Sequence, residues 1–416
     1  MQDQTATALV VEYLNRAAAH HGEGHVTRDD VDTAMRLGCG LPQGPLAHLD
    51  DLGIDVAIAM LDDAGIRPAA ILIRMACDGR LGRRVGRGFY DYDRPDIGQT
   101  GAPQDSGPSG APRPPRRLGV VGSGTMARGI AQVGAVAGLH TTVVARTDER
   151  AALARAQIGR SLTAAVSRGR LDEPTRMTAE ECLTTSADQA ALAGCDVVVE
   201  AVAEDADIKR RVFAALAAAC PTDTVLATTT SSLSVAACAA AAGRPADVLG
   251  LHFFNPAPAM RLVEIAATAT TSAQTVATAH ALVRRLGKVS VHSADRCGFI
   301  VNYLLFGYLN RAITLLERGA VRAEEFDATI RAEFGYPMGP FALLDTIGLD
   351  VSLAILRRLH DEFGEPCFAP APALSALVAA GRLGRKTGTG FLSEIPRTRP
   401  RQTAMAGNAV ATGGVR

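Results

Sequence analysis

Part of this chain is repeated within it. With a constant offset of 295 residues, YLNRA at 13–17 recurs at 308–312, and 19 of the 44 positions from 13 to 56 are identical to their counterparts. The similarity resumes after a seven-residue difference in length, where GRLGRRVGRGFYDY at 79–92 matches GRLGRKTGTGFLSE at 381–394. Amphipathic stretches broken by Gly-Pro turns run through both copies. The repeat therefore predicts two all-α helical domains, at 1–93 and 297–394.

A different pattern lies between the copies. Residues 94–116 are rich in Pro, Gly and Ser and predict a disordered linker, and residues 395–416 predict a disordered tail. From 117 to 296, six short β-branched runs alternate with Ala-rich helical patterns: RLGVVG, TTVVA, CDVVVEAV, TVLATT, VLGLHFF and KVSVH. This alternation predicts an α/β domain with a doubly wound parallel sheet, flanked by the two helical domains.

The first strand of this middle domain runs directly into a glycine turn, GSGTMA at 122–127. Gly122 permits the tight turn, and Gly124 lets the N–H groups around Thr125 and Met126 approach a pyrophosphate. Ala127 is small enough for the following helix to pack on the strand. The turn predicts a Rossmann-type dinucleotide site.

The end of the second strand bears on which dinucleotide binds. An NAD site usually has an acidic residue there for the ribose 2′-hydroxyl, whereas this strand ends in Ala145 and Arg146. A guanidinium suits a 2′-phosphate, so the sequence favours NADP over NAD. Two alternatives stay open: Arg146 is only a solvated loop residue, or Asp148 takes over the ribose contact.

Composition excludes several classes of function. Lys plus Arg and Asp plus Glu are 43 each, which indicates neither a nucleic-acid nor a membrane partner. The sequence shows no apolar membrane span and no signal peptide, so we expect a cytoplasmic protein. Its eight cysteines are scattered without a C-x-x-C motif, and we expect reduced thiols and no metal site.

Three polar residues indicate chemistry at the carboxyl edge of the predicted sheet. Ser231 follows the strand TVLATT and His252 lies at the end of VLGLHFF, so both face the crevice where such folds bind ligands. Glu264 lies twelve residues beyond His252, far enough for the chain to return and set a carboxylate against the imidazole. A histidine braced in this way suits a general base that accepts an alcohol proton. Taken singly, each has a plainer interpretation: a helix cap, a core histidine and a surface charge.

Together these motifs resemble one family. GSGTMARGIAQ, SSLS, LHFFNPAPAMRLVE, GFIVN, YPMGPFALLDTIGLD and GRLGRKTGTGF are similar to the L-3-hydroxyacyl-CoA dehydrogenases, including 3-hydroxybutyryl-CoA dehydrogenases, over residues 117–394. The resemblance implies that His252 is the catalytic base, with Glu264 as its partner. It further implies substrate contacts from Ser231 and Asn302, cofactor-cleft positions at Glu204, Lys209, Asn255 and Lys386, and coenzyme A contacts from Ser161 and Arg168, with Arg170 nearby.

The chain departs from the family at three positions. Thr229 replaces an asparagine, Tyr303 replaces an arginine and Ala145 replaces the acid at the end of the second strand. The first and third are consistent with a change of cofactor, whereas Tyr303 leaves the shape of the pocket open. Rival functions are a dehydrogenase acting on carrier-protein thioesters and a non-catalytic relative.

The N-terminal copy has Thr7 where the C-terminal copy has Asn302, and no GFIVN precedes it. It therefore lacks the substrate-binding asparagine. The resemblance implies that helical domains of this kind dimerise, and our hypothesis is that residues 1–93 pack on 297–394 as a covalent substitute for a partner subunit. A vestigial duplication and a docking surface for another protein are the alternatives.

Overall fold

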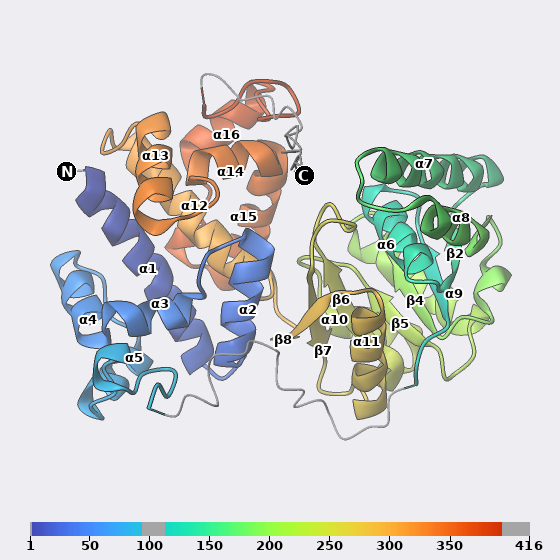
Figure 1. Ribbon diagram of the computed structural model, residues 1–416, viewed down its shortest axis with the longest axis horizontal. Helices are drawn as coiled ribbons and strands as arrows, with labels where there is room; N and C mark the ends of the chain where they lie inside the picture. Colours follow the sequence, from blue (N-terminus) through green and yellow to red (C-terminus); the bar gives the residue numbers. More distant parts are fainter. Residues whose placement is uncertain (1, 94–112, 393–416) are drawn as a thin grey trace, which may run out of the picture.

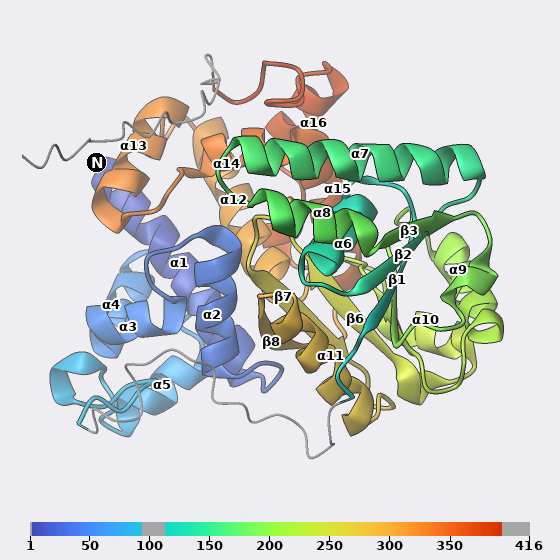
Figure 2. The same ribbon diagram turned by 45° about the vertical axis from the view of Figure 1, so that its right-hand side comes forward.

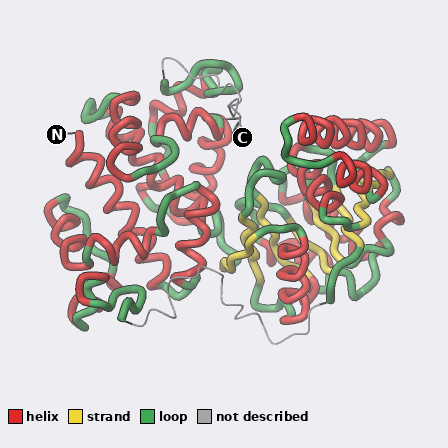
Figure 3. Tube along the Cα trace, viewed as in Figure 1, coloured by secondary structure: helices red, strands yellow, loops and turns green. Residues whose placement is uncertain are grey.

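The strands that the structure describes all lie between residues 117 and 294, and the segments on either side are helical (Figure 3). The structure is a computed structural model and describes residues 2–93 and 113–392. The predicted tail and most of the predicted linker, residues 94–112, lie outside these ranges. Figure 1 shows the helical copies side by side, with the sheet domain next to them.

One eight-stranded sheet forms the middle domain, in the order β3-β2-β1-β4-β5-β6-β7-β8. Its first six strands are parallel in the Rossmann order, as predicted. β7 is antiparallel to β6, and β8 is parallel to β7, so the predicted doubly wound parallel sheet has one antiparallel pairing near this edge. The short connection from β6 to β7 accounts for the reversal, because a parallel pairing needs a long crossover. The strands are β1 Arg117–Val121, β2 His140–Val144, β3 Leu183–Ser186, β4 Val197–Glu200, β5 Val225–Thr228, β6 Val248–Phe253, β7 Leu262–Ala267 and β8 Val289–Ala294.

Helices cover both faces of this sheet because its strands are apolar on both sides. Alternate residues of a strand point to opposite faces, so Val120 joins the core under one set of helices and Val121 the core under the other. The first set comprises α6 (Thr125–Val136), α7 (Asp148–Ser167), α8 (Glu173–Glu181) and α11 (Ala273–Arg285), and the second comprises α9 (Ala206–Ala219) and α10 (Val235–Ala242).

The two repeated segments fold into the same five helices. The N-terminal copy contains α1 (Gln2–Gly22), α2 (Arg28–Cys39), α3 (Pro45–Leu52), α4 (Ile54–Asp63) and α5 (Ala70–Cys77). The C-terminal copy contains α12 (Val301–Glu317), α13 (Ala323–Phe334), α14 (Pro340–Ile347), α15 (Leu349–Phe363) and α16 (Pro372–Ala379).

A buried carboxylate makes the same contacts in both copies. Asp32 accepts hydrogen bonds from the first amides of α3, and Asp327 accepts the equivalent bonds from α14. The residue before each helix must be glycine, because a Cβ at Gly44 or Gly339 would overlap the aspartate. Burial raises the pKa of each carboxyl to about 6, although the amide hydrogen bonds oppose the shift. The Gly-Pro turns of the repeat are thus helix starts capped by a distant side chain.

The copies pack against each other around one shared hydrophobic core. Their contacts are reciprocal: a Cβ at Gly40 would lie 3.4 Å from Pro337, and one at Gly335 would lie 3.7 Å from Pro42. Gly40 and Gly335 are equivalent positions, as are Pro42 and Pro337. Such pairing of a surface with its own counterpart is the mark of a two-fold interface. Within the described residues, the two helical copies therefore pack against each other. Within the described residues, no helix is both long and apolar enough to span a bilayer.

Candidate active site

His252 and Glu264 face each other directly across β6 and β7. The antiparallel register pairs these two residues, so their side chains lie on the same face of the sheet. The imidazole Nδ1 lies 2.6 Å from Glu264 Oε2, and both side chains are buried. With Nδ1 bonded to the carboxylate, Nε2 is the ring nitrogen left to exchange a proton with a ligand.

The second oxygen of Glu264 is held by the start of helix α12. The backbone amides of Ile300 and Val301 donate to Oε1 at 3.0 and 2.9 Å, and the carboxylate has no solvent exposure. The two hydrogen bonds fix the orientation of the carboxylate. Asn302 is the next residue of the same helix.

Aromatic rings complete the wall around His252. The ring of Phe254 meets the imidazole edge-on at 4.6 Å between centroids, and Phe299 lies at 5.4 Å. Phe299 has a backbone φ of 47°, which is uncommon for a residue with a side chain. Asn255 follows Phe254 and forms a cis peptide bond with Pro256. The sequence HFFNP thus forms the end of β6 and the turn next to the imidazole.

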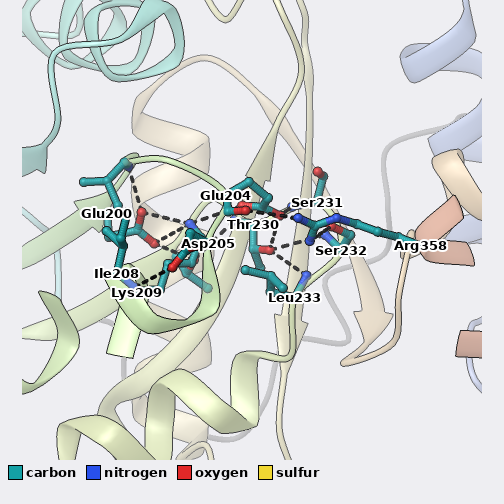
Figure 4. Close-up of polar contacts among 12 residues, drawn as sticks. Glu200, Glu204, Asp205, Ile208, Lys209, Thr230, Ser231, Ser232, Leu233 and Arg358 are labelled. Carbon is teal, nitrogen blue, oxygen red and sulfur yellow. Dashed lines mark hydrogen bonds and ion pairs between the residues drawn. The ribbon is translucent and has the colours of Figure 1, made fainter. Parts of the chain in front are cut away.

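Ser231 lies beyond the end of β5, the neighbour of β6, so the structure brings it to the same edge as His252. Its backbone amide donates to Glu204, which also accepts from Thr230 and Ser232 (Figure 4). Burial opposes ionisation of Glu204, but Lys209 and these hydrogen bonds outweigh it and lower its pKa. The Glu204 carboxylate therefore shapes the loop that carries Ser231.

Arg358 on α15 connects this loop to the C-terminal helical copy. Its guanidinium donates to the Ser232 hydroxyl at 2.9 Å and to the Glu204 carbonyl at 3.0 Å (Figure 4). The sequence reasoning did not select Arg358. A helical arginine in a polar stretch carries no pattern that distinguishes it from a solvated one.

Lys209 lies beneath this loop rather than on its surface. Its ammonium group is 1% exposed and contacts both oxygens of Glu200, at 2.8 and 2.7 Å, and the Thr228 hydroxyl at 3.4 Å. Glu200 and Thr228 end β4 and β5, so the lysine ties together the ends of two central strands. The ammonium group also lies 3.3 Å from Glu204, and the assignment of both residues to the cofactor cleft stays a prediction.

The glycine turn fits a dinucleotide. Gly122 has φ of 126°, and a Cβ there would lie 2.4 Å from the Ala201 carbonyl oxygen, so only glycine is accommodated. Gly124 is the N-cap of α6, and no side chain caps this helix, which leaves the first amides of α6 without an intrahelical acceptor. These amides and the positive end of the helix dipole suit a pyrophosphate.

The end of β2 lies beside this turn in the sheet, since β1 and β2 are neighbours. Ala145 is buried and Arg146 is exposed. An open pocket of about 360 Å³ lies between the glycine turn and the start of α7. Its lining residues are Ser123, Arg128, Glu149, Arg150, Leu153, Ala154 and Gln157. Two arginines, Arg128 and Arg150, therefore line the pocket. The exposed Arg146 lies four residues before Arg150 in the chain and is not part of the lining.

Three more of the predicted site residues, Ser161, Arg168 and Lys386, make no hydrogen bond or ion pair with His252 or Glu264 in the part of the chain that the structure describes. Ser161 is exposed on α7 and Arg168 is exposed at its C-cap. Lys386 is ion-paired with Asp350 at 2.7 Å within the C-terminal copy. The ring of Tyr303 lies next to two arginines: the guanidinium of Arg296 is 4.5 Å from its centroid and that of Arg16 is 5.9 Å away. The guanidinium groups of Arg16 and Arg296 thus place positive charge next to Tyr303.

A Rossmann sheet with an uncapped glycine turn and a buried His–Glu pair at its carboxyl edge defines a nicotinamide-dependent oxidoreductase. Comparison with known proteins gives the particular family. Residues 117–296 match the model for the 3-hydroxyacyl-CoA dehydrogenase NAD binding domain, and both 5–92 and 298–394 match the model for the 3-hydroxyacyl-CoA dehydrogenase C-terminal domain. The chain belongs to the 3-hydroxyacyl-CoA dehydrogenase family.

Individual relatives agree with this assignment. A 3-hydroxybutyryl-CoA dehydrogenase from Mycobacterium tuberculosis is 41% identical over 278 residues, which are 66% of this chain and 97% of that protein. A Clostridioides difficile protein of the same name is 38% identical over 275 residues, 66% of this chain and 98% of its own. The crystal structure of (S)-3-hydroxybutyryl-CoA dehydrogenase from Ralstonia eutropha is 36% identical, with a TM-score of 0.64 over 67% of this chain and 98% of that one.

Proposed function

We propose that this protein interconverts L-3-hydroxyacyl and 3-oxoacyl thioesters of coenzyme A, with acetoacetyl-CoA as a short-chain substrate, and that it prefers NADP. The observation that carries the chemistry is the His252–Glu264 pair at the edge of the dinucleotide-binding sheet. The bound nicotinamide supplies the hydride donor or acceptor. The protein supplies the proton transfer and the orientation of the thioester.

In the oxidative direction, His252 Nε2 accepts the proton of the substrate hydroxyl as the C3 hydride leaves. Glu264 keeps the other nitrogen, Nδ1, protonated and stabilises the imidazolium that forms. In the reductive direction the imidazolium returns this proton to the 3-oxo oxygen. Ser231 and Asn302 lie on the two segments that flank the pair, and we assign them the hydrogen bonds that orient the substrate oxygen.

The preference for NADP rests on the end of β2. Ala145 cannot accept a hydrogen bond from a ribose 2′-hydroxyl, and the exposed guanidinium of Arg146 suits a 2′-phosphate. The neighbouring pocket is lined by two arginines, Arg128 and Arg150, and one carboxylate, Glu149, so its charged side chains sum to one positive charge. Since cells commonly keep their NADP pool reduced, we propose reduction of the 3-oxo group as the physiological direction. On the substrate side, Ser161, Arg168 and Arg170 are exposed and suit the phosphates of coenzyme A.

We further propose that the chain is a monomer whose two helical copies replace the dimer of its family. The reciprocal contacts of Gly40 and Gly335 support this proposal, because one chain already contains both halves of a two-fold interface. In such a monomer, one dinucleotide-binding domain is served by both helical copies of the same chain.

Initial rates with a series of 3-oxoacyl-CoA substrates from C4 to C16, each with NADPH and NADH, test the proposal. We expect turnover with NADPH to exceed that with NADH at equal concentration, and the His252→Gln variant to be at least about 100-fold slower. Turnover by that variant at the wild-type rate would contradict the assigned base. A clear NADH preference would overturn the cofactor proposal, and faster reaction of carrier-protein thioesters would replace coenzyme A as the substrate carrier.

A further inference from the structure

Helix α2 of the N-terminal copy contains a glycine that the second copy lacks. Gly38 lies within α2, and the equivalent residue of α13 is Glu333, which is exposed. A glycine inside a helix costs about 1 kcal/mol relative to alanine, so this position calls for a reason. The environments of the two helices differ: α2 lies against the end of the sheet at β7 and β8 (Figure 2), whereas Glu333 of α13 remains exposed.

The contact at Gly38 is too close for a side chain. A Cβ there would lie 2.9 Å from Val301 Cγ2 and 3.1 Å from Leu262 Cδ2, and the first distance requires something to shift. Leu262 begins β7 and Val301 begins α12. Helix α2 thus packs on the two elements that meet at Glu264.

One contacted residue holds the Glu264 carboxylate, and the other lies on the same strand as Glu264. Val301 donates its amide to Oε1 at 2.9 Å, and Leu262 precedes Glu264 by two residues on the same strand and therefore shares its face. Burial, with a smaller contribution from the charge of Glu264, raises the pKa of the thiol of Cys39, next to Gly38, to about 12. The end of α2 therefore packs on Leu262 and Val301, the residues at the start of β7 and α12.

Two further contacts hold the N-terminal copy on the segment that leads into α12. Asp30, at the start of α2, accepts from the His292 amide of β8 at 3.0 Å. Arg296 contacts His20 Nδ1 at 3.1 Å and Glu23 at 3.2 Å, both at the end of α1 and its turn. The N-terminal copy therefore touches the segment 292–301 at its beginning, middle and end.

We infer that the N-terminal copy positions the acid–base pair, with Gly38 as the positioning residue that lets α2 close on Leu262 and Val301. This inference rests on the proposed function, in which Glu264 orients His252. A side chain at position 38 displaces Val301, and with it the amides that hold the carboxylate. The N-terminal copy thereby affects catalysis indirectly, because its helix α2 fixes the position of Val301 and so of the Glu264 carboxylate.

The variant Gly38→Val in the full-length chain tests this inference. Because a displacement of about 1 Å can cost up to about 100-fold in rate, we expect kcat to fall by about 10- to 100-fold. The KM for the thioester and the dissociation constant of NADPH, measured by its fluorescence, should change by less than about twofold. Adding Val301→Ala removes the two methyl groups that the new side chain meets and should restore most of kcat.

The matched control is Glu333→Val, at the equivalent helical position of the second copy, which should leave kcat unchanged. Wild-type kcat in folded Gly38→Val, an equal loss in Glu333→Val, or no rescue by Val301→Ala overturns the inference. If Gly38→Val does not fold, Gly38→Ala decides, because its Cβ alone meets Val301: a lowered kcat supports the inference and a wild-type kcat overturns it. The His252→Gln variant reports on the proposed function separately, since it leaves the contact at Gly38 intact.

Discussion

Tyr13 and Tyr308 occupy equivalent positions in the two helical copies, and their rings pack edge to face with centroids 5.7 Å apart. A residue that meets its own counterpart lies on the two-fold axis of an interface. The covalent chain thus contains an interface of the kind that ordinarily joins two subunits.

This arrangement predicts that the full-length protein sediments as a monomer. Deleting residues 1–93 exposes the apolar face of α12 around Tyr308, so the shortened chain should self-associate or aggregate, as sedimentation velocity would show. A stable homodimer with the same affinity before and after the deletion would contradict the prediction.

The variant Glu264→Gln should lower kcat by about 100- to 10,000-fold, with little change in KM. The amide oxygen can still accept from Ile300 and Val301, which leaves the amide NH₂ group pointing at Nδ1 of His252. The imidazole then carries its proton on Nε2 and no longer serves as the base. Steady-state rates of 3-hydroxybutyryl-CoA oxidation measure the loss, and wild-type kcat would exclude the role of the carboxylate.

The double variant Ala145→Asp, Arg146→Gln should reverse the cofactor preference. Its carboxylate accepts from a ribose 2′-hydroxyl and repels a 2′-phosphate, so the ratio of kcat/KM for NADPH over NADH should fall by about 10- to 100-fold. The kcat at saturating cofactor serves as the control, because neither residue contacts the His–Glu pair. An unchanged ratio would show that the 2′-position is recognised elsewhere.

Replacing Lys209 by methionine should lower the free energy of unfolding by about 3–5 kcal/mol, because Glu200 is left charged and buried without its partner. Urea denaturation measures the change. Arg210→Met is the matched control: Arg210 is the next residue on α9 and pairs with Asp207 at the surface, so its loss should cost less than about 1 kcal/mol. Equal effects of the two substitutions would argue against a structural role for the buried pair.

His20 should make the protein less stable in mild acid. Burial, together with the charge of Arg296, lowers the pKa of His20 to about 3, whereas the ordinary value is 6.5. Between these values the unfolded chain binds the extra proton, so stability falls as the pH falls through this range. In His20→Gln, which keeps an acceptor for Arg296, the loss between pH 7.5 and pH 5 should be smaller by about 2 kcal/mol. His25→Gln, at an exposed histidine, should behave like wild type.

Much of the fold could be predicted from local patterns. The glycine turn, six of the eight strands and the duplication all follow from periodicity, turn residues and self-similarity, which are properties of short windows or of the chain compared with itself. The strands β3 and β7 were missed. LTTS is too short and polar to stand out, and LVEIAA carries a charge in its middle.

The charged residue in β7, Glu264, illustrates which contacts local patterns do not predict. Taken singly, Glu264 resembles a surface residue, and the sequence predicted its pairing with His252 only from their spacing and the family resemblance. Its burial and the contact itself arise because β7 reverses direction and pairs with β6 in one particular register. Likewise, burial of Lys209, the contact of Arg358 with the Ser231 loop and the closeness of Gly38 to Val301 depend on segments that are far apart in the chain. Local patterns and self-similarity were sufficient to predict the helical repeat, the nucleotide turn and the residue types available for chemistry. Only the folded chain shows which charged side chains contact each other and that α2 packs on Val301. Electrostatic and steric contacts depend on distances in space that local sequence does not encode.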